Sequence, residues 1–139
     1  MSIAIEPAAE GDLGDIDALW REAFADDEPR HRAVLTVPVK LAFQPDLFLV
    51  AREGGRLVGS VMAGYDGYRG HINRMAVLQS HRRRGVGLLL MREAEARLKA
   101  LGCVKINLQI RAGNNDVAEF YRKLGYAVEE HLDMAKKMS

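Results

Sequence analysis

The stretch that decides the fold is Met75-Ala-Val-Leu-Gln-Ser-His-Arg-Arg-Arg-Gly-Val-Gly-Leu-Leu-Leu-Met91. It begins with an apolar run typical of a strand, passes through a basic turn with two glycines, and continues as a helix with no acidic residue before Glu93. Such a turn brings backbone N–H groups, the positive end of a helix dipole and three guanidinium groups close together. The stretch therefore predicts a site for a polyanion such as a pyrophosphate.

The two glycines of this turn, Gly85 and Gly87, remove Cβ atoms where a ligand has to approach the backbone. The amide groups from about Arg83 to Leu88 can then point at phosphate oxygens. A P-loop would need a Gly-Lys-Ser/Thr ending, and a dinucleotide-binding fingerprint would need three glycines after a first strand. Neither pattern is present, and the alternative interpretation is a solvated basic turn before an ordinary helix.

The composition limits the class of protein. A chain of 139 residues fits one domain, 1–139. With 20 basic and 19 acidic residues the net charge is +1, which argues against a nucleic-acid-binding protein. The single cysteine, Cys103, excludes a disulfide within the chain and a cysteine-based zinc site, so we expect no metal. We find no signal-peptide pattern or membrane-spanning apolar stretch, and we expect a cytoplasmic protein with no membrane partner.

The hydrophobic pattern predicts an α+β fold, an α/β arrangement of three layers, in which a mixed, mostly antiparallel sheet of six to seven strands is flanked by about four helices. The predicted strands are Ser2–Glu6, Leu47–Arg52, Leu57–Tyr65, His71–Leu78, Val104–Ile110 and one or two more within Tyr126–Met138. The predicted helices cover about 12–25, a short or broken piece within 30–43, then 85–101 and about 114–124. The strands on either side of the long helix should be parallel neighbours joined by a right-handed crossover.

A second feature is Asn114, followed by Phe120-Tyr121-Arg122-Lys123-Leu124-Gly125-Tyr126. Asn114 and Tyr121 are seven residues apart, which is two helical turns, so both can face one ligand. A tyrosine hydroxyl can give a proton to a leaving thiolate. The alternative interpretation is that Asn114 is a helix cap and Tyr121 a partly buried packing residue.

Taken together, Arg82-x-x-Gly85-x-Gly87 and the Asn114/Tyr121 segment strongly resemble the GNAT family of acetyl-CoA-dependent N-acetyltransferases. The resemblance covers nearly the whole chain and is greatest to small bacterial members similar to the ribosomal-protein alanine N-acetyltransferases. It implies transfer of an acetyl group from acetyl-CoA to a primary amine by direct attack. It also implies a splayed pair of strands, His71–Leu78 and Val104–Ile110, that admits the pantetheine arm.

The same resemblance implies the site residues. Backbone groups of Met75, Ala76 and Val77 would pair with the pantetheine arm, the loop would hold the pyrophosphate, and Asn114 would bond the pantetheine region. Tyr121 would protonate the CoA thiolate. The expected cofactor-binding residues are Met75, Ala76, Val77, Arg82, Arg83, Arg84, Gly85, Val86, Gly87, Leu88, Asn114 and Tyr121.

The general base is less well defined. His71 lies upstream of Val77, where some family members have a glutamate, and a histidine with the usual pKa of ~6.5 could take the proton directly or through water. A surface histidine at the start of a strand is the alternative. Asp66, Glu22 and Asp26 are further candidates for the base.

The amine acceptor is not encoded in any motif of the sequence. A protein N-terminus, a lysine and a small-molecule amine all remain open, and 26–45 is a hypothetical specificity segment. A catalytically silent acyl-CoA-binding regulator is the alternative function. A free edge strand near the C-terminus would allow either a monomer or a homodimer.

Overall fold

The computed structural model describes residues 2–138. It contains two compact units, Met1–Leu108 and Gln109–Ser139. The first unit holds every strand and three of the α-helices, and the second holds the last helix.

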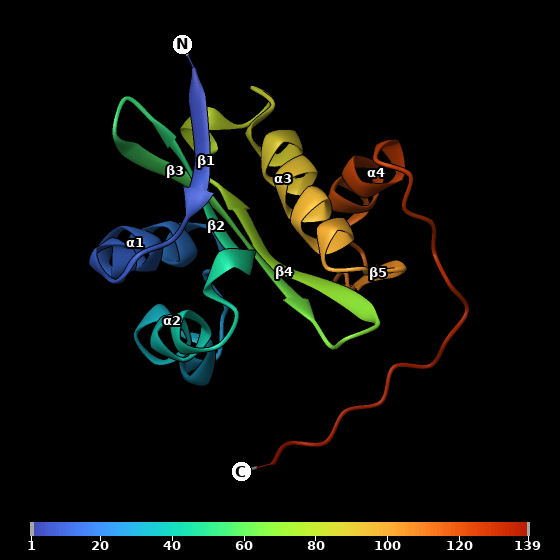
Figure 1. The fold of residues 1–139 in the computed structure, drawn as a ribbon. Coiled ribbons are helices and arrows are strands. Elements are labelled where there is room, and N and C mark those ends of the chain that lie inside the picture. Colours follow the sequence, from blue (N-terminus) through green and yellow to red (C-terminus); the bar gives the residue numbers. More distant parts are fainter. Residues whose placement is uncertain (1, 139) are drawn as a thin grey trace. The chain divides into compact units, whose positions relative to one another are not determined.

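The sheet of the first unit has five strands in sequential order (Figure 1). They are β1 (Ile3–Pro7), β2 (Phe48–Glu53), β3 (Arg56–Tyr65), β4 (Arg69–Val77) and β5 (Lys105–Leu108). The first four pair antiparallel, because short turns join them or, for β1, because the connection through two helices returns the chain to the opposite end. β4 and β5 pair parallel, which confirms the predicted neighbours on either side of the long helix.

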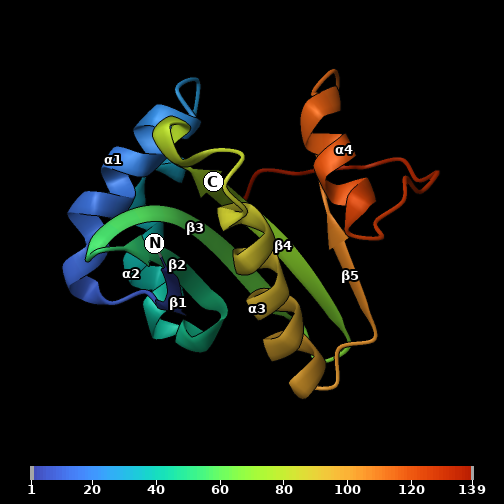
Figure 2. The same ribbon diagram turned by 90° about the horizontal axis from the view of Figure 1, so that it is seen from above.

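Helices cover both faces of this sheet (Figures 1 and 2). One face carries α1 (Leu13–Ala23) and α2 (Ala33–Ala42), and the other carries α3 (Val86–Ala100). The first layer buries Ile16, Leu19 and Trp20 of α1, which recur at helical spacing, against Phe48 and Val50 of β2. The predicted three-layer fold class is thereby confirmed.

The helix α3 lies very close to the sheet because two glycines face it. A Cβ at Gly59 would be 3.0 Å from Leu90 Cδ1, and a Cβ at Gly70 would be 3.0 Å from Leu98 Cδ1. The buried residues of α3 are Val86, Leu90, Met91, Ala94 and Leu98. Leu89 and Leu101 of the same region are 38% and 52% exposed and lie outside this buried face.

The short or broken helix expected within 30–43 is a short one: α2 has 10 residues and is continuous, with Pro38 inside it. The C-terminal segment differs from prediction. The one or two strands expected within 126–138 are absent from the described residues, so the sheet has five strands rather than six or seven. The alternation of Val128, Leu132 and Met134 is compatible with a strand, but these side chains are 78–93% exposed.

The second unit contains α4 (Asn115–Lys123), capped by Asn114. The remainder of this unit, to residue 138, has no regular secondary structure. Over the described part of the chain, none of the helices combines the length and the apolar character that a membrane span requires.

Candidate functional site

The edge of β4 changes its pairing halfway along the strand. β5 pairs with β4 from Arg69 to Ile72, and no pairing with β5 extends to Asn73–Val77 within residues 2–138. Leu78 donates its N–H to the Val58 carbonyl of β3 at 2.9 Å. Because N–H groups alternate in direction along a strand, Val77 and Met75 present theirs to the unpaired edge and Ala76 faces β3. The backbone therefore offers an extended ligand two free positions, at Met75 and Val77.

A β-bulge precedes this edge. Asn73 pairs with Met62 and Ala76 with Ser60, so Arg74 and Met75 together oppose Val61. Arg74 has a φ of 53°, in the left-handed region. The bulge turns the strand at the point where it leaves β5.

Buried polar groups hold the bulge in place. Trp20 Nε1 donates to Ser60 Oγ at 2.9 Å, and Ser60 Oγ donates to the Arg74 carbonyl at 2.9 Å. The Arg74 guanidinium lies 4.7 Å from the ring centroid of Phe24 and 5.0 Å from that of Trp20, and it pairs with Asp27 at 2.9 Å. Sequence analysis missed Ser60 and Arg74, because nothing in the sequence distinguishes them from ordinary strand residues.

The glycine loop follows a turn of 3-10 helix at Gln79–His81. Arg83 has a φ of 63° and Gly85 a φ of 82°, and Gly85 is the N-cap residue of α3. Leu89 donates its N–H to the Gly85 carbonyl at 3.0 Å, and the N–H groups of Val86, Gly87 and Leu88 before it have no carbonyl four residues back within α3. These N–H groups, with the start of a helix whose first turn has no acidic residue, form a cradle for an anion.

The three arginines of the loop have different surroundings. Arg84 forms an ion pair with Glu53 of β2, and the same carboxylate lies 3.2 Å from Nε2 of the buried His81. Arg82 and Arg83 have exposed side chains without an ion-pair partner among the described residues. The structure thus leaves two of the three guanidinium groups available to a ligand, and it identifies Glu53 as a residue that sequence reasoning missed.

The candidate bases lie on the first unit in separate places. His71 is exposed on β4, opposite Gly64 of β3. Asp66 accepts the N–H groups of Tyr68 and Arg69 at 2.8 and 2.7 Å, and these hydrogen bonds, chiefly that from Arg69, lower the pKa of its carboxyl. Glu22 accepts the N–H of Gln79 at 2.9 Å. Both carboxylates accept backbone donors, whereas Asp26 is exposed in the turn after α1. His71 and Asp26 therefore stay open as candidates.

Asn114 and Tyr121 lie in the second unit. Asn114 Oδ1 accepts the N–H of Val117 at 3.4 Å, as an N-cap residue does. Tyr121 is buried, with its ring in edge contacts to Phe120 and Tyr126 at centroid distances of 5.0 and 5.6 Å. Burial raises the pKa of Tyr121 to about 12. Its hydroxyl therefore keeps its proton at physiological pH and is available as an acid or a hydrogen-bond donor.

The structure brings the residues of the first unit together on one continuous segment. His71, the unpaired edge and the glycine loop follow one another from β4 into α3. Cys103, by contrast, donates its Sγ–H to the Lys105 carbonyl at 3.3 Å and packs where a Gly70 Cβ would be, which indicates a packing role. Residues 2–138 contain no group of three or more side chains arranged to hold a metal ion.

A family model and several named proteins resemble this chain over most of its length. Residues 15–126 match the model of the acetyltransferase (GNAT) family. Acetyltransferase SG1711 of Sodalis glossinidius is 38% identical over 121 residues, which are 87% of this chain and 84% of the relative. Acetyltransferase ECA0875 of Pectobacterium atrosepticum is 42% identical over 99 residues, which are 71% of this chain and 70% of the relative.

Solved structures share the fold. The PaiA N-acetyltransferase of Thermoplasma acidophilum, in complex with coenzyme A, superposes with a TM-score of 0.81 at 23% identity, over 94% of this chain and 93% of that chain. An aminoglycoside 6'-N-acetyltransferase of Acinetobacter haemolyticus superposes with a TM-score of 0.79 at 26% identity, over 98% and 99% of the two chains. The chain therefore belongs to the GNAT family of acetyltransferases.

Proposed function

We propose that this protein transfers the acetyl group of acetyl-CoA to a primary amine by direct attack. One observation carries the proposal: a strand edge at Met75 and Val77 that β5 does not pair leads within a few residues into the first-turn amide groups of α3. An elongated ligand with an amide-containing arm at one end and a pyrophosphate at the other matches this sequence of donors. Acetyl-CoA is such a ligand.

The chain would hold acetyl-CoA in two stages. The pantetheine arm would add to the free edge of β4 as an extra strand, bonded at Met75 and Val77. The pyrophosphate would accept hydrogen bonds from the amides of the glycine loop, with Arg82 and Arg83 as charged partners. Arg84 would stay with Glu53 and keep the loop in position.

The chemistry follows from this placement. A neutral amine attacks the thioester carbonyl, whose oxygen is polarised by a backbone N–H of the β4 edge. The C–S bond breaks as the C–N bond forms, and the resemblance to the family makes Tyr121 the proposed proton donor to the thiolate. By the same resemblance, Asn114 would bond the pantetheine arm.

Amines need help to lose their proton, since a lysine amine has a pKa of ~10.4 and an α-amine of ~8. His71 is four residues upstream of Met75, which is roughly 13 Å along a strand. The bulge at Arg74 also lies between these two residues, and we place water molecules between the amine and His71.

The test has two measurements. Acetyl-CoA should raise the melting temperature, because a ligand at 100 times its Kd stabilises the folded state by ~2.7 kcal/mol. Thiol release should then depend on added amine. Replacing Arg82 and Arg83 by glutamine should weaken acetyl-CoA binding by about 1.5–3 kcal/mol for each charged hydrogen bond lost.

The two measurements separate the possible failures. An unchanged melting temperature at saturating acetyl-CoA would refute acyl-CoA binding altogether. A normal melting shift without thiol release for any amine would refute the enzyme and favour a silent acyl-CoA-binding regulator.

A further inference from the structure

The helix α2 carries two apolar faces, and packing within the chain explains only one. Ala33 and Val37 are each 1% exposed and belong to the core beneath α1. Leu35, Val39 and Phe43 are 56%, 68% and 64% exposed on another face of the same helix. A surface helix needs a single apolar stripe, so the second one indicates a binding surface.

This second face forms one wall of a groove. The groove has a volume of about 330 Å³ and is lined by Leu35, Thr36, Val39, Lys40, Phe43 and Met62. Met62, the lining residue that comes from the sheet, is the cross-strand partner of Asn73 on β4. The pairing of β4 with β5 ends just before Asn73. The groove residue Met62 on β3 is therefore one strand away from the β4 edge to which we assign the acetyl group.

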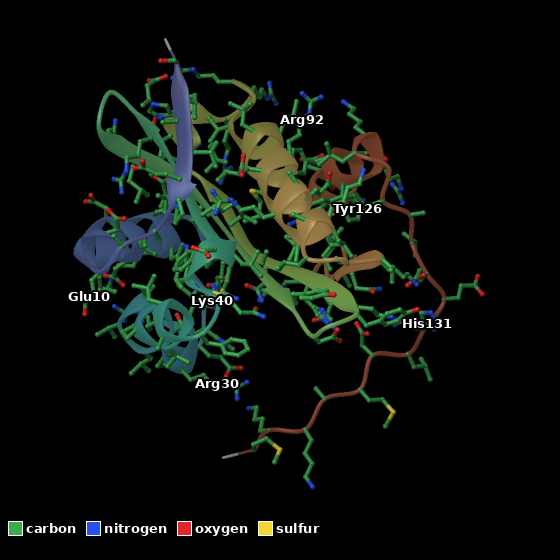
Figure 3. All side chains as sticks on the ribbon, in the orientation of Figure 1. Glu10, Arg30, Lys40, Arg92, Tyr126 and His131 are labelled. Atoms are coloured by element: carbon green, nitrogen blue, oxygen red, sulfur yellow. The ribbon has the colours of Figure 1, made fainter. Side chains whose placement is uncertain are left out.

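Lys40 gives the groove a positive charge (Figure 3). Its ammonium lies 3.3 Å from Gln44 Oε1 and 6.0 Å from the centroid of the Phe43 ring, and no carboxylate of the described residues is within ion-pair distance. Burial lowers the pKa of Lys40. A half-buried cation without an acidic partner is stabilised by an anionic ligand.

The ammonium is also close to the candidate base. Lys40 Nζ lies 3.9 Å from the position of a Cβ on Gly64, and Gly64 is the cross-strand partner of His71. The apolar groove, the cation and the part of β4 that leads to the acetyl position are therefore on one face of the sheet.

Two of the carboxylates that precede α2 are already paired with arginines. Asp27 pairs with Arg74 at 2.9 Å, and Glu28 pairs with Arg30 at 2.9 Å. The groove itself presents methyl groups, an aromatic ring and an ammonium. Its chemistry suits an acceptor with one amine, one large apolar side chain and one negative charge.

We propose that the acceptor is an α-amino acid with a large apolar side chain. This inference rests on the proposed function. The side chain would occupy the α2 groove and the carboxylate would pair with Lys40. The neutral α-amine would attack the thioester carbon: a C–N bond forms, the C–S bond breaks, the amine proton leaves through water, and the thiolate is protonated to give CoA and an N-acetyl amino acid.

Binding can be tested without turnover by calorimetry on the CoA-saturated protein. The probes are L-phenylalanine, L-phenylalaninamide, glycine and spermidine. Phenylalanine should bind at least about tenfold more tightly than the amide, which lacks the negative charge, and than glycine, which lacks the side chain. Spermidine should bind most weakly.

Three variants test which residues bind phenylalanine. Val39→Asp should abolish phenylalanine binding, and Val34→Asp is its matched control, since Val34 is exposed on α2 but does not line the groove. Lys40→Met should remove the difference between phenylalanine and its amide. In all three variants the melting shift with acetyl-CoA should match wild type.

The outcomes distinguish this inference from the proposed function. Equal affinity for phenylalanine and its amide, stronger binding of spermidine, no binding of phenylalanine, or equal effects of Val39→Asp and Val34→Asp would each overturn the amino-acid acceptor. Phenylalanine binding that depends on Val39 and Lys40, but without thiol release from acetyl-CoA, would support the groove and refute the transferase.

Discussion

Glu53, the last residue of β2, binds Arg84 of the glycine loop through both carboxylate oxygens, with Nη1 3.3 Å from Oε1. The same carboxylate lies 3.2 Å from the buried His81, whose Nδ1 in turn is 2.7 Å from Ser80 Oγ. Glu53 thus holds the segment before α3 at two residues, His81 and Arg84. Arg84, which we predicted from the sequence to bind the cofactor, instead pairs with Glu53 and holds the loop in position.

Glu53→Gln should therefore destabilise the protein in a pH-dependent way. The Arg84 guanidinium, with a smaller effect from His81, lowers the pKa of Glu53. A carboxylate whose pKa is lower in the folded state stabilises the fold at pH values above the unfolded-state pKa of ~4.3. This stabilisation is lost as the pH falls through the folded-state pKa. The melting-temperature gap to wild type should be largest near pH 7 and should close on acidification below pH ~4. Glu119→Gln, which removes an exposed pair with Arg122, should show almost no gap at any pH.

Gly85→Val should remove acetyl-CoA binding. Gly85 has a φ of 82° with open space around the missing Cβ, so the substitution causes backbone strain rather than a clash. A side chain in the left-handed region costs about 1–2 kcal/mol, and relief of that strain would move the loop amides. Gly67→Val, at a φ of 99° in the β3–β4 turn, should lose similar stability yet keep the acetyl-CoA melting shift. Retained binding in Gly85→Val would contradict the role of the loop.

Sequence patterns predicted the first five strands and the parallel neighbours of the long helix because these depend on local features. Alternation over 57–65, a helical stripe after Gly85 and a turn between them define which strands are adjacent and where the parallel crossover lies. The glycine loop could be predicted for the same reason, since its glycines and arginines are contiguous.

The remaining features depend on contacts between distant residues. The bulge at Arg74 is stabilised by Trp20 and Ser60, which are 54 and 14 residues away along the chain, and no local pattern encodes that chain of hydrogen bonds. The ion pair between Glu53 and Arg84 likewise joins residues that are 31 positions apart. The prediction of a strand within 126–138 was wrong for a related reason. Alternation shows that a segment can form a strand, but a strand also needs a neighbouring strand to pair with.

Tyr121→Phe should slow turnover by about 10²-fold or more, the usual contribution of a general acid, with little change in acetyl-CoA affinity. Burial raises the pKa of Tyr121 to about 12, so the hydroxyl keeps its proton up to pH 10. Loss of that proton should therefore cause no fall in the turnover rate below pH 10. The measurement is single-turnover thiol release against pH. Tyr126→Phe, at the neighbouring ring, is the control and should retain most of the rate. Unchanged turnover in Tyr121→Phe would remove this residue from the mechanism.

His71→Gln should lower turnover at neutral pH by about 10²-fold if the amine proton leaves through this side chain. Acetyl-CoA binding should be unaffected, because the histidine is upstream of the unpaired edge of β4. Raising the pH should restore much of the rate, since the acceptor then loses its proton without help. His131→Gln, an exposed histidine of the second unit, should behave as wild type. A His71→Gln defect that does not diminish at high pH would argue for a structural role.

Ser60→Ala should cost about 1–3 kcal/mol of stability, because it leaves the buried Trp20 Nε1 and the Arg74 carbonyl without their shared hydroxyl. Trp20→Phe removes the first of these donors. If the two residues act through one chain of hydrogen bonds, the double variant should be less destabilised than the sum of the single variants, whereas independent packing effects would add. The bulge that this chain stabilises lies beside the edge assigned to the thioester, so turnover should fall more than acetyl-CoA affinity. Strict additivity in denaturant unfolding, with unaltered turnover, would show that the bulge forms without Ser60.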